Sequence, residues 1–328
     1  MNGAPPVLVV TRLDDATADV VIEELGRRSV PVVRLDPGDF PDTVTVAARV
    51  GGSGLMGGSG LGGEVRTETR SAALEGVRSV YWRRPRPYSE PEGLSEQDAG
   101  WCAQQARHGL GGILTVLPGA HYVNHPWRNR AAEYKPAQLS AAARCGLHVP
   151  PTLLTNDVEQ ARRFLRDHGP VVYKPLYNSD YTGRDGQGLT VWVEEVDMAD
   201  LDAGVGHTMH LFQSRVDKVA DIRLTAVGNR LFAVRIDGSP GLDWRRHYDD
   251  LDYRLIDTPS DVAKAVHDYL AAFGLVYGAF DFGLDAAGRW HWYECNPNGQ
   301  FAWFPDPVTD RITAALADRL QHPDRDSR

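Results

Sequence analysis

The segment Tyr277–Gln300, YGAFDFGLDAAGRWHWYECNPNGQ, decides the fold because it contains two strands joined by a short turn. Side chains alternate between the two faces of a strand, so Glu294 and Asn296 share one face and Cys295 points to the other. The first strand contains one acidic residue, Asp281, between two phenylalanines that point the opposite way. Pairing of the two strands can therefore bring Asp281 level with Glu294 and Asn296.

These three polar side chains indicate a magnesium site. Two carboxylates and an amide oxygen form a cluster of hard oxygen ligands, which suits Mg²⁺ held between the protein and phosphate oxygens. A structural polar cluster at a strand end is the alternative, but adjacent buried carboxylates repel each other unless a cation offsets their charge. Cys295 is a poor ligand for such an ion, and we expect its thiol in the core.

Candidate phosphate-binding residues precede this segment. Lys174 ends the apolar run VVYK, which is an unusual place for a surface charge. The loop that follows contains Gly183, Gly186 and Gly188, and its backbone amides can fold over phosphates. The motif GxxxxGK[ST] is absent, so this loop is not a P-loop. We expect a further strand over Leu189–Glu194.

Arginines gather in a chain that is acidic as a whole. Arg223 stands two residues after Asp221 near the start of one predicted strand, and Arg235 lies on its hairpin partner. Arg245 stands two residues after Asp243. Each of these arginines alone is more often part of a surface ion pair. Together they suit a site for phosphates and carboxylates, because a guanidinium group binds such oxygens in a forked geometry.

Three further basic residues stand outside these runs. Lys135 lies on a helix predicted from Pro126 to Cys145, where a solvated side chain is the simplest interpretation. Arg83 and Arg84 follow the strand predicted over Ser79–Trp82. Because successive residues alternate across a strand, at most one of these two arginines should face a cleft.

The composition excludes several classes of protein. The chain has 328 residues and a formal net charge of −9, which argues against a protein that binds duplex nucleic acid. Its three cysteines include no CxxC pair and are typical of the reducing cytoplasm. Neither a secretory signal nor a membrane-spanning apolar run is present, so we expect a cytoplasmic protein without a membrane partner.

The N-terminal part begins as strand, helix and strand, but the turn after the first strand lacks glycine. We therefore expect a scaffold rather than a dinucleotide site. Glycines gather instead over residues 51–63, GGSGLMGGSGLGG, between strands predicted at Thr43–Val50 and Glu64–Thr69. A flexible hairpin connection is the favoured interpretation of this run.

In their order along the chain, these features resemble the ATP-grasp superfamily. The resemblance covers about residues 124–310 and includes the passage GLxVPxT at 146–152 and the hinge at 211–217. More narrowly, the chain resembles the graspetide synthetases, which mature ribosomal peptides. The segments that carry this narrower resemblance are SVYWRRP (79–85), the FQ hinge with VDK (212–218), DWR (243–245) and ECNPNGQFAWF (294–304).

This resemblance implies an α/β (α+β) protein with the ATP-grasp fold in three parts. An N-terminal pre-ATP-grasp βαβ domain would span residues 1–125. A central domain, residues 126–207, would contain the phosphate lysines, the glycine loop and a docking region for a leader peptide at about 180–210. A C-terminal antiparallel-sheet domain, residues 208–328, would contain the hinge and the metal ligands.

The resemblance also implies a role for each candidate residue. The residues that would bind ATP are Lys135, Lys174, Gly183, Gly186, Gly188, Gln213, Arg215, Val216 and Asp217. The residues that would hold Mg²⁺ are Asp281, Glu294 and Asn296. The candidate catalytic residues are Arg223 and Arg245, and the candidate substrate-binding residues are Arg83, Arg84, Arg235 and Asp243. Ser214 stands where many relatives have an acidic residue facing adenine, and Tyr293, like Cys295, is expected to point into packing.

The chemistry implied by the resemblance is activation of a carboxylate. ATP phosphorylates a side-chain carboxylate of a peptide, and a hydroxyl or amine of the same peptide attacks the acyl phosphate, which closes a macrocyclic ester or amide. The expected partner is a ribosomal precursor peptide with a leader and an acidic, Thr- or Ser-containing core. The expected cofactors are ATP and Mg²⁺, and the expected assembly is a homodimer. The precursor, the ring connectivity and the choice between ester and amide stay open.

Two other functions remain open at this point. An ATP-grasp ligase that adds a free amino acid to a small molecule or a protein C-terminus would share every ATP-binding residue. A non-catalytic scaffold that binds nucleotide or peptide is disfavoured, because both lysines and all three metal ligands are present.

Overall fold

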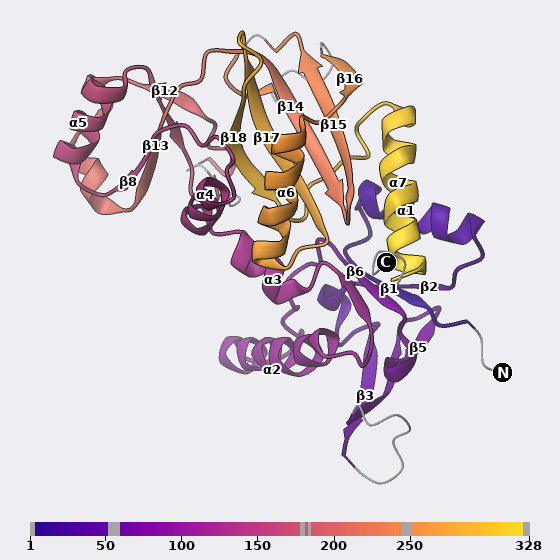
Figure 1. Ribbon diagram of the computed structural model, residues 1–328. Coiled ribbons are helices and arrows are strands. Elements are labelled where there is room, and N and C mark those ends of the chain that lie inside the picture. Colours follow the sequence, from indigo (N-terminus) through magenta and orange to yellow (C-terminus); the bar gives the residue numbers. More distant parts are fainter. Residues whose placement is uncertain are drawn as a thin grey trace.

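The computed structural model describes residues 4–51, 60–177, 181–182, 185–239, 241–244 and 251–323. Within these residues it contains a parallel sheet, several antiparallel sheets and helices that cover their faces (Figure 1). Residues 52–59 of the glycine run, Gly183 and Arg245 lie outside the described residues.

The N-terminal sheet is parallel and has the strand order β2-β1-β6-β7. Its strands are β1 (Val7–Val10), β2 (Val32–Leu35), β6 (Ser79–Trp82) and β7 (His121–Val123), and its helices are α1 (Ala16–Arg27) and α2 (Glu96–Thr115). The run VLVV in β1 is apolar on both faces, as a covered parallel sheet requires. One set of its alternating side chains packs with α1, and the other set packs with α2.

A small antiparallel sheet extends from this part of the chain. It consists of β3 (Thr45–Val50), β4 (Leu61–Arg66) and β5 (Ser71–Ala73), and β3 pairs with β4 as predicted. Gly63 is needed in β4 because its φ is +143° and an added Cβ would lie 2.9 Å from the Cα of Ala48. The glycine run thus connects two strands of a hairpin.

The rest of the chain forms a central sheet and a C-terminal sheet. The central elements are α3 (Pro126–Ala132), α4 (Lys135–Arg144), β8 (Thr152–Thr155), α5 (Val158–His168), β9 (Val171–Lys174), β10 (Tyr181–Thr182), β11 (Gly188–Leu189), β12 (Glu194–Val196) and β13 (His210–Ser214). The C-terminal elements are β14 (Lys218–Val227), β15 (Arg230–Asp237), β16 (Asp252–Ile256), α6 (Ser260–Phe273), β17 (Tyr277–Asp285), β18 (Trp290–Asn296) and α7 (Asp306–Gln321).

The single helix predicted from Pro126 to Cys145 is wrong, because the structure divides it into α3 and α4. Pro136 has no amide hydrogen with which to continue a helix across this point. The Gln138 side chain replaces that donor, since its Nε2 donates to the carbonyl oxygen of Ala132 at 2.6 Å. The break makes Lys135 the first residue of α4, so its side chain leaves from the end of a helix.

The central sheet is antiparallel, with the order β12-β9-β13-β8, and α5 shares its core. The strand predicted over Leu189–Glu194 is wrong, because residues 190–193 are irregular and lie between the short strands β11 and β12. The predicted domain limits at residues 125 and 207 stay predictions. The pairing of β13 with both β8 and β9 supports a central subdomain that runs to Ser214.

The C-terminal sheet is antiparallel, with the order β16-β15-β14-β17-β18. Its apolar face packs on α6 and α4, where Ile222 of β14 and Phe280 of β17 are buried. Because side chains alternate, Arg223 and Asp281 belong to the opposite face. The edge strand β16 was not among the predicted strands, because its sequence DYRLI has no clear alternation of apolar and polar residues.

The register of β17 and β18 confirms the predicted pairing of Asp281 with Glu294. The pairing shifts directly after Asp281, so Tyr293 is an extra residue in a β-bulge. The prediction that Tyr293 follows Cys295 into packing is wrong. Cys295 is buried as expected, but Tyr293 lines a cavity beside Glu294, because a bulge turns one side chain out of the alternation.

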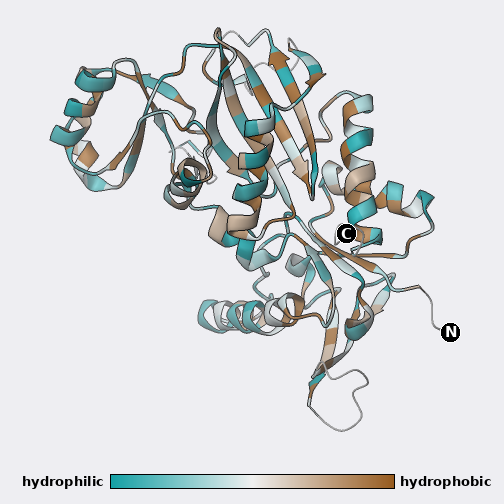
Figure 2. Ribbon diagram, viewed as in Figure 1, coloured by the Kyte–Doolittle hydropathy of each residue, from teal (hydrophilic) through white to brown (hydrophobic). Residues whose placement is uncertain are grey.

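The last helix, near the C-terminus, packs against the first helix, near the N-terminus. α7 packs against α1 and against the C-terminal sheet, so one apolar core runs from the N-terminal sheet through both helices (Figure 1). Figure 2 shows hydrophobic residues along the strands of both large sheets and mainly hydrophilic residues on α5. In the part of the chain that the structure describes, no helix is both long and apolar enough to cross a membrane.

Candidate active site

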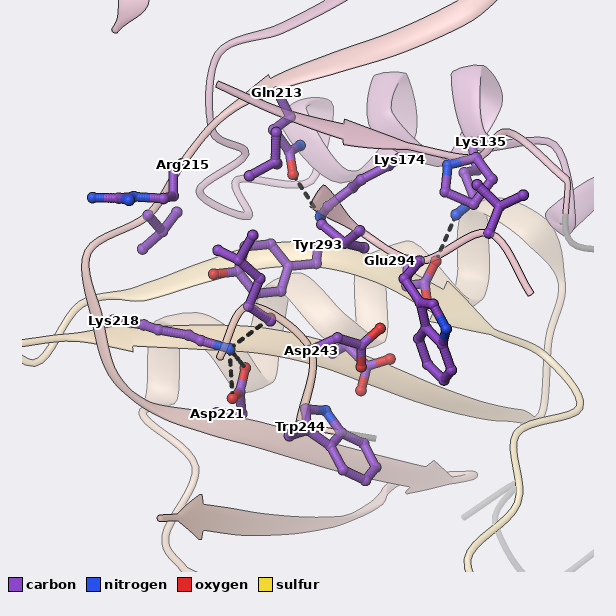
Figure 3. Close-up of a pocket in the computed structure, with 18 of the residues that line it drawn as sticks. Lys135, Lys174, Gln213, Arg215, Lys218, Asp221, Asp243, Trp244, Tyr293 and Glu294 are labelled. Carbon is purple, nitrogen blue, oxygen red and sulfur yellow. Dashed lines mark hydrogen bonds and ion pairs between the residues drawn. The ribbon is translucent and has the colours of Figure 1, made fainter. Parts of the chain in front are cut away.

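A cavity of about 300 Å³ lies between the central sheet and the C-terminal sheet (Figure 3). The central half contributes residues of α4, β9, β13 and the segment 190–193, and the C-terminal half contributes β14, β17, β18 and the segment 242–244. Its charged lining residues are Lys135, Lys174, Arg215, Lys218, Asp221, Asp243, Asp281 and Glu294. The fold therefore brings both predicted lysines and both predicted carboxylates into one cavity.

Each of the two carboxylates is paired with a cation. Arg223 Nη1 donates to both carboxylate oxygens of Asp281 at 2.8 Å. Lys135 Nζ donates to Glu294 Oε2 at 2.9 Å. These pairs offset the repulsion between two adjacent acids. Arg223 is buried and does not line the cavity, and among the described residues its enclosed Nε has no hydrogen-bond partner.

The third predicted metal ligand, Asn296, lies two residues beyond Glu294 and opposite Ala279, but it does not line the cavity. Its Oδ1 accepts a hydrogen bond from the amide of Asn298 at 2.9 Å. Within the described residues, no group of three or more His, Cys, Asp or Glu side chains is arranged to bind a metal ion. Two carboxylates and a nearby amide fit Mg²⁺ when phosphate oxygens supply the other ligands.

Lys174 is held by neighbours from both sheets. Its Nζ donates to Gln213 Oε1 at 2.7 Å, and Gln213 Nε2 donates to Thr152 Oγ1 at 2.9 Å. The same Nζ lies 4.2 Å from the centre of the Tyr293 ring (Figure 3). The predicted phosphate lysine and the predicted Gln213 therefore belong to one network, which ends on an aromatic ring.

Residues 215–217 connect the two sheets at the predicted hinge. The amide of Arg215 donates to the carbonyl oxygen of Pro170 at 2.8 Å, and the amide of Lys218 donates to the carbonyl oxygen of Val216 at 3.0 Å. Among the described residues, the amide hydrogen of Val216 has no backbone partner, which leaves a donor for a base such as adenine. Asp217 is exposed and does not line the cavity.

The glycine loop is described in part. β10 and β11 pair with Thr182 opposite Gly188, so the loop closes a hairpin. Gly186 has a φ of +79°, a left-handed conformation that glycine adopts without strain. Contact between this loop and phosphates stays a prediction.

The structure separates the predicted substrate-binding residues. Arg83 is 2% exposed, and its Nε and Nη2 pair with the Asp15 carboxylate at 3.2 and 3.3 Å. Arg84 is half-buried, and its guanidinium has no hydrogen bond or ion pair to another described residue. Burial, together with the charge of Arg83, lowers the pKa of Arg84. Of the two arginines, Arg84 is therefore the one whose charge is left for a ligand.

The other two members of that set also differ from each other. Arg235 Nε donates to Asp237 at 2.9 Å, and Arg235 does not line the cavity. Asp243 is buried and lines the cavity beside Trp244. The structure thus places Asp243 in the same cavity as Asp281 and Glu294, and it leaves Arg235 outside that cavity in an ion pair with Asp237.

The segment that contains the predicted metal ligands Glu294 and Asn296 is fixed by residues from earlier in the chain. Asn124 and Arg83 donate to the carbonyl oxygens of residues 297–299 at 3.0 or 3.1 Å. The Gln138 side chain makes two hydrogen bonds to the backbone of Cys295, at 2.9 and 3.0 Å. Asn124 and Gln138 were not predicted from the sequence, because the sequence does not distinguish a buried asparagine or glutamine from an exposed one.

Lys218 and Asp221 form a second pair that the sequence did not assign. Lys218 Nζ donates to both Asp221 oxygens at 2.7 Å and to the carbonyl oxygen of Leu242 at 2.9 Å. Burial raises the pKa of Asp221 to about 6, against the opposing charge of Lys218. The sequence segment VDK drew attention to Lys218, but only the structure shows that its partner is Asp221.

Comparison with known proteins gives a result at the level of structure. No protein-family model matches the chain, and a search of curated proteins found no match. The macrocyclase MdnC from Microcystis aeruginosa MRC, solved with its precursor peptide MdnA, is 26% identical with a TM-score of 0.83, covering 97% of this chain and 99% of that chain. The macrocyclase MdnB from the same organism is 25% identical with a TM-score of 0.77, covering 96% of this chain and 99% of that chain.

A third solved structure combines nucleotide and peptide. The RiPP-associated ATP-grasp ligase from Chryseobacterium gregarium, in complex with ADP and a leader and core peptide, is 24% identical with a TM-score of 0.87, covering 97% of each chain. The protein studied here therefore has the ATP-grasp fold, with its cavity between the central and C-terminal sheets. Its likeness extends over nearly the whole chain to two macrocyclases, one of them solved with a precursor peptide, which confirms the resemblance predicted from the sequence.

Proposed function

We propose that this protein is an ATP-dependent ligase that closes macrocycles in a ribosomal precursor peptide through ester or amide bonds between side chains. One observation carries the proposal. A single cavity between two sheets gathers both predicted phosphate lysines, the two cation-paired carboxylates predicted to bind Mg²⁺, and two residues of the predicted hinge. These residues are Lys135, Lys174, Asp281, Glu294, Arg215 and Val216. Similarity to solved macrocyclases over nearly the whole chain supports the peptide as the substrate.

The proposed reaction has two steps. A side-chain carboxylate oxygen of the peptide attacks the γ-phosphorus of ATP, and ADP leaves. A hydroxyl or amine of the same peptide then attacks the carbonyl carbon of the acyl phosphate, phosphate leaves and the nucleophile loses its proton. The protein needs no nucleophile of its own, so it acts by charge neutralisation and by positioning the reactants.

The cavity residues divide this work. Lys135 and Lys174 would bind phosphate oxygens of ATP. Asp281 and Glu294, with Asn296 nearby, would hold Mg²⁺, which offsets the charge of the phosphoryl group when bound. Arg223 is buried beside Asp281 and does not line the cavity, so its proposed role of binding the acyl phosphate rests on the family resemblance.

The finer features of the partner are also proposals. The remaining charge of Arg84 supports an acidic core peptide, because a partly buried guanidinium gains most from a carboxylate. Docking of the leader on residues 180–210, a role for Arg245 and a homodimeric assembly are proposed on the family resemblance. The free thiols of Cys102, Cys145 and Cys295 support a place in the reducing cytoplasm.

Mass spectrometry tests the proposed function. The full-length protein is incubated with ATP, Mg²⁺ and a precursor peptide encoded by a short reading frame beside its gene. We expect ADP release that depends on the peptide, and a peptide that loses the mass of one water molecule for each bond formed. A gain in mass equal to an amino acid would indicate the alternative ligase. Absence of ATP turnover with any acidic peptide would contradict the proposal.

A further inference from the structure

Tyr293 occupies a position that the alternation of β18 does not give it. The β-bulge directly after the pair of Asp281 and Glu294 places Tyr293 in the cavity instead of with Cys295 in the core. Figure 3 shows its ring at the centre of the cavity, between Lys174 on one side and the pair of Lys218 and Asp221 on the other. A bulge next to a candidate active site often re-aims one side chain.

The neighbouring strand makes room for this ring. Gly283 of β17 has no side chain, and an added Cβ would overlap the Tyr293 hydroxyl oxygen and lie 2.8 Å from Cζ. The phenol is mostly enclosed, and burial raises its pKa, so the ring stays neutral. The bulge and Gly283 together give the Tyr293 ring one defined position.

The ring in turn contacts the ammonium group of Lys174. The distance of 4.2 Å from Nζ to the ring centre is within the range of a cation–π interaction. The other partner of this ammonium described above is the oxygen of Gln213 at 2.7 Å. Tyr293 and Gln213 come from different sheets, so together they fix the position of the Lys174 ammonium group across the cavity.

We propose that Tyr293 is a positioning residue, whose ring holds the Lys174 ammonium in place to bind the phosphates of a nucleotide. The inference rests on the proposed function, because it takes the anion at Lys174 to be a nucleotide phosphate. The ring acts through the lysine, so its effect depends on phosphate groups and not on the base. The hydroxyl group of Tyr293 has no part in this role.

Nucleotide affinity tests the inference without a peptide. ADP and adenosine are titrated into the full-length protein with Mg²⁺ by isothermal titration calorimetry. We expect Tyr293→Leu to weaken ADP binding about tenfold, the range of a largely desolvated cation–π contact, with little change for adenosine. Tyr293→Phe keeps the ring and should stay within about twofold of the wild type. If Tyr293→Phe loses as much as Tyr293→Leu, the hydroxyl group matters and the inference is wrong.

Gly283→Ala offers a second route, because it displaces the ring without changing Tyr293. We expect the same loss of ADP affinity as in Tyr293→Leu. Gly109→Ala is the matched control, since a Cβ at Gly109 on α2 meets no atom within 4 Å. An ADP affinity in Gly283→Ala equal to that of the control would overturn the inference, provided that both variants have the far-UV circular dichroism of the wild type.

A double-mutant cycle separates the positioning role from a structural one. In a Lys174→Met background, Tyr293→Leu should cause no further loss of ADP affinity, because the lysine is already absent. An equal loss in both backgrounds, or an equal loss for adenosine and ADP, would show that the ring acts on the fold or on the base. Failure of the wild type to bind ADP at all would instead contradict the proposed function.

Discussion

Glu294 depends on Lys135 for charge compensation. The two side chains form an ion pair of 2.9 Å inside the cavity, and each has a second proposed partner. Phosphate oxygens of ATP would compete with Glu294 for Lys135, and Mg²⁺ would compete with Lys135 for Glu294. Nucleotide and metal should therefore favour each other's binding, because either one replaces the partner that the other removes.

Glu294→Ala tests this residue directly. We expect an intact fold, with the free energy of unfolding within about 1 kcal/mol of the wild type, because both members of the pair are partly solvated. Ligation should be abolished, since one of the two carboxylates for Mg²⁺ is lost. Thermal unfolding and peptide mass spectrometry measure the two effects. The matched control is Glu159→Ala on the exposed face of α5. Near-normal conversion by Glu294→Ala would show that the metal assignment is wrong.

Asp221 predicts a pH dependence of stability. Its pKa of about 6 in the folded protein lies above the ordinary value of 3.8, so protonation of Asp221 stabilises the fold. That stabilisation is fully present below about pH 4 and is lost as the pH rises through about 6. The amide introduced by Asp221→Asn cannot titrate, so relative to this variant the wild type should lose about 1–3 kcal/mol between about pH 4 and pH 7.

Urea unfolding across that pH range measures the difference between wild type and Asp221→Asn. The substitution leaves Lys218 without its carboxylate partner at every pH in the range, which adds a constant offset and no slope. A difference that does not vary with pH would show that Asp221 has an ordinary pKa.

At the scale of elements, the joint between α3 and α4 connects Lys135, a predicted phosphate residue, to the strand that contains the predicted metal ligands. Gln138 donates a hydrogen bond to the carbonyl oxygen of Ala132, because Pro136 has no amide hydrogen to donate. The Gln138 side chain also makes hydrogen bonds to the backbone of Cys295 on β18. The same side chain therefore fixes the start of α4, where Lys135 stands, and the strand that carries Glu294.

Gln138→Leu should destabilise the protein by about 2–4 kcal/mol, because it leaves buried backbone groups without partners. Gln104→Leu is the control, since Gln104 is exposed on α2, and there we expect a change within about 0.5 kcal/mol. Urea denaturation compares the two variants. Equal stabilities would show that the joint does not depend on the Gln138 amide.

The β-bulge is the element-scale feature that the sequence did not reveal. Strict alternation predicts the faces of Asp281, Glu294 and Cys295 correctly, because these residues pair in regular register. It fails at Tyr293, because no residue type marks where one strand of a pair gains an extra residue. Gly283 on the partner strand leaves space for the Tyr293 ring, but a glycine in a strand does not by itself indicate which side chain fills that space.

At the scale of the whole molecule, the N-terminal part of the chain supports the candidate active site. Arg83, which directly follows β6, pairs with Asp15 and donates to the carbonyl oxygens of Asn298 and Gly299. An added Cβ at Gly299 would lie 2.7 Å from Arg223 Nη2. The turn at Gly299 therefore packs closely against Arg223, while its carbonyl oxygen accepts a hydrogen bond from Arg83. The turn after the predicted metal ligands is thus held by a residue from the N-terminal part of the chain.

Arg83→Met should cost about 3–5 kcal/mol of stability, because it leaves the buried carboxylate of Asp15 without its cation. Arg66→Met is the control, because Arg66 pairs with Glu64 and both side chains are exposed, so this pair should contribute about 1 kcal/mol or less. Chemical denaturation measures both variants. If Arg83→Met is as stable as the control, the contact between the two domains is not needed to hold the turn.

The sequence by itself determined the class of fold, most of its elements and the family that it resembles. Alternation in β17 and β18 placed Asp281 opposite Glu294, and an apolar strand ending in Lys174 marked a candidate phosphate residue. The pairing is confirmed because it depends on a period of two residues, which is a local property, whereas the phosphate role of Lys174 stays a prediction.

Only the tertiary structure decided which charges meet. It buried Arg83 and left the charge of Arg84 open, paired Arg223 with Asp281, ended one helix before Lys135 and turned Tyr293 into the cavity. These outcomes depend on contacts between residues that are distant in sequence and on the space that neighbouring strands leave. No local pattern contains that information, because an arginine in a buried clamp and an arginine facing a ligand are the same residue until the chain has folded.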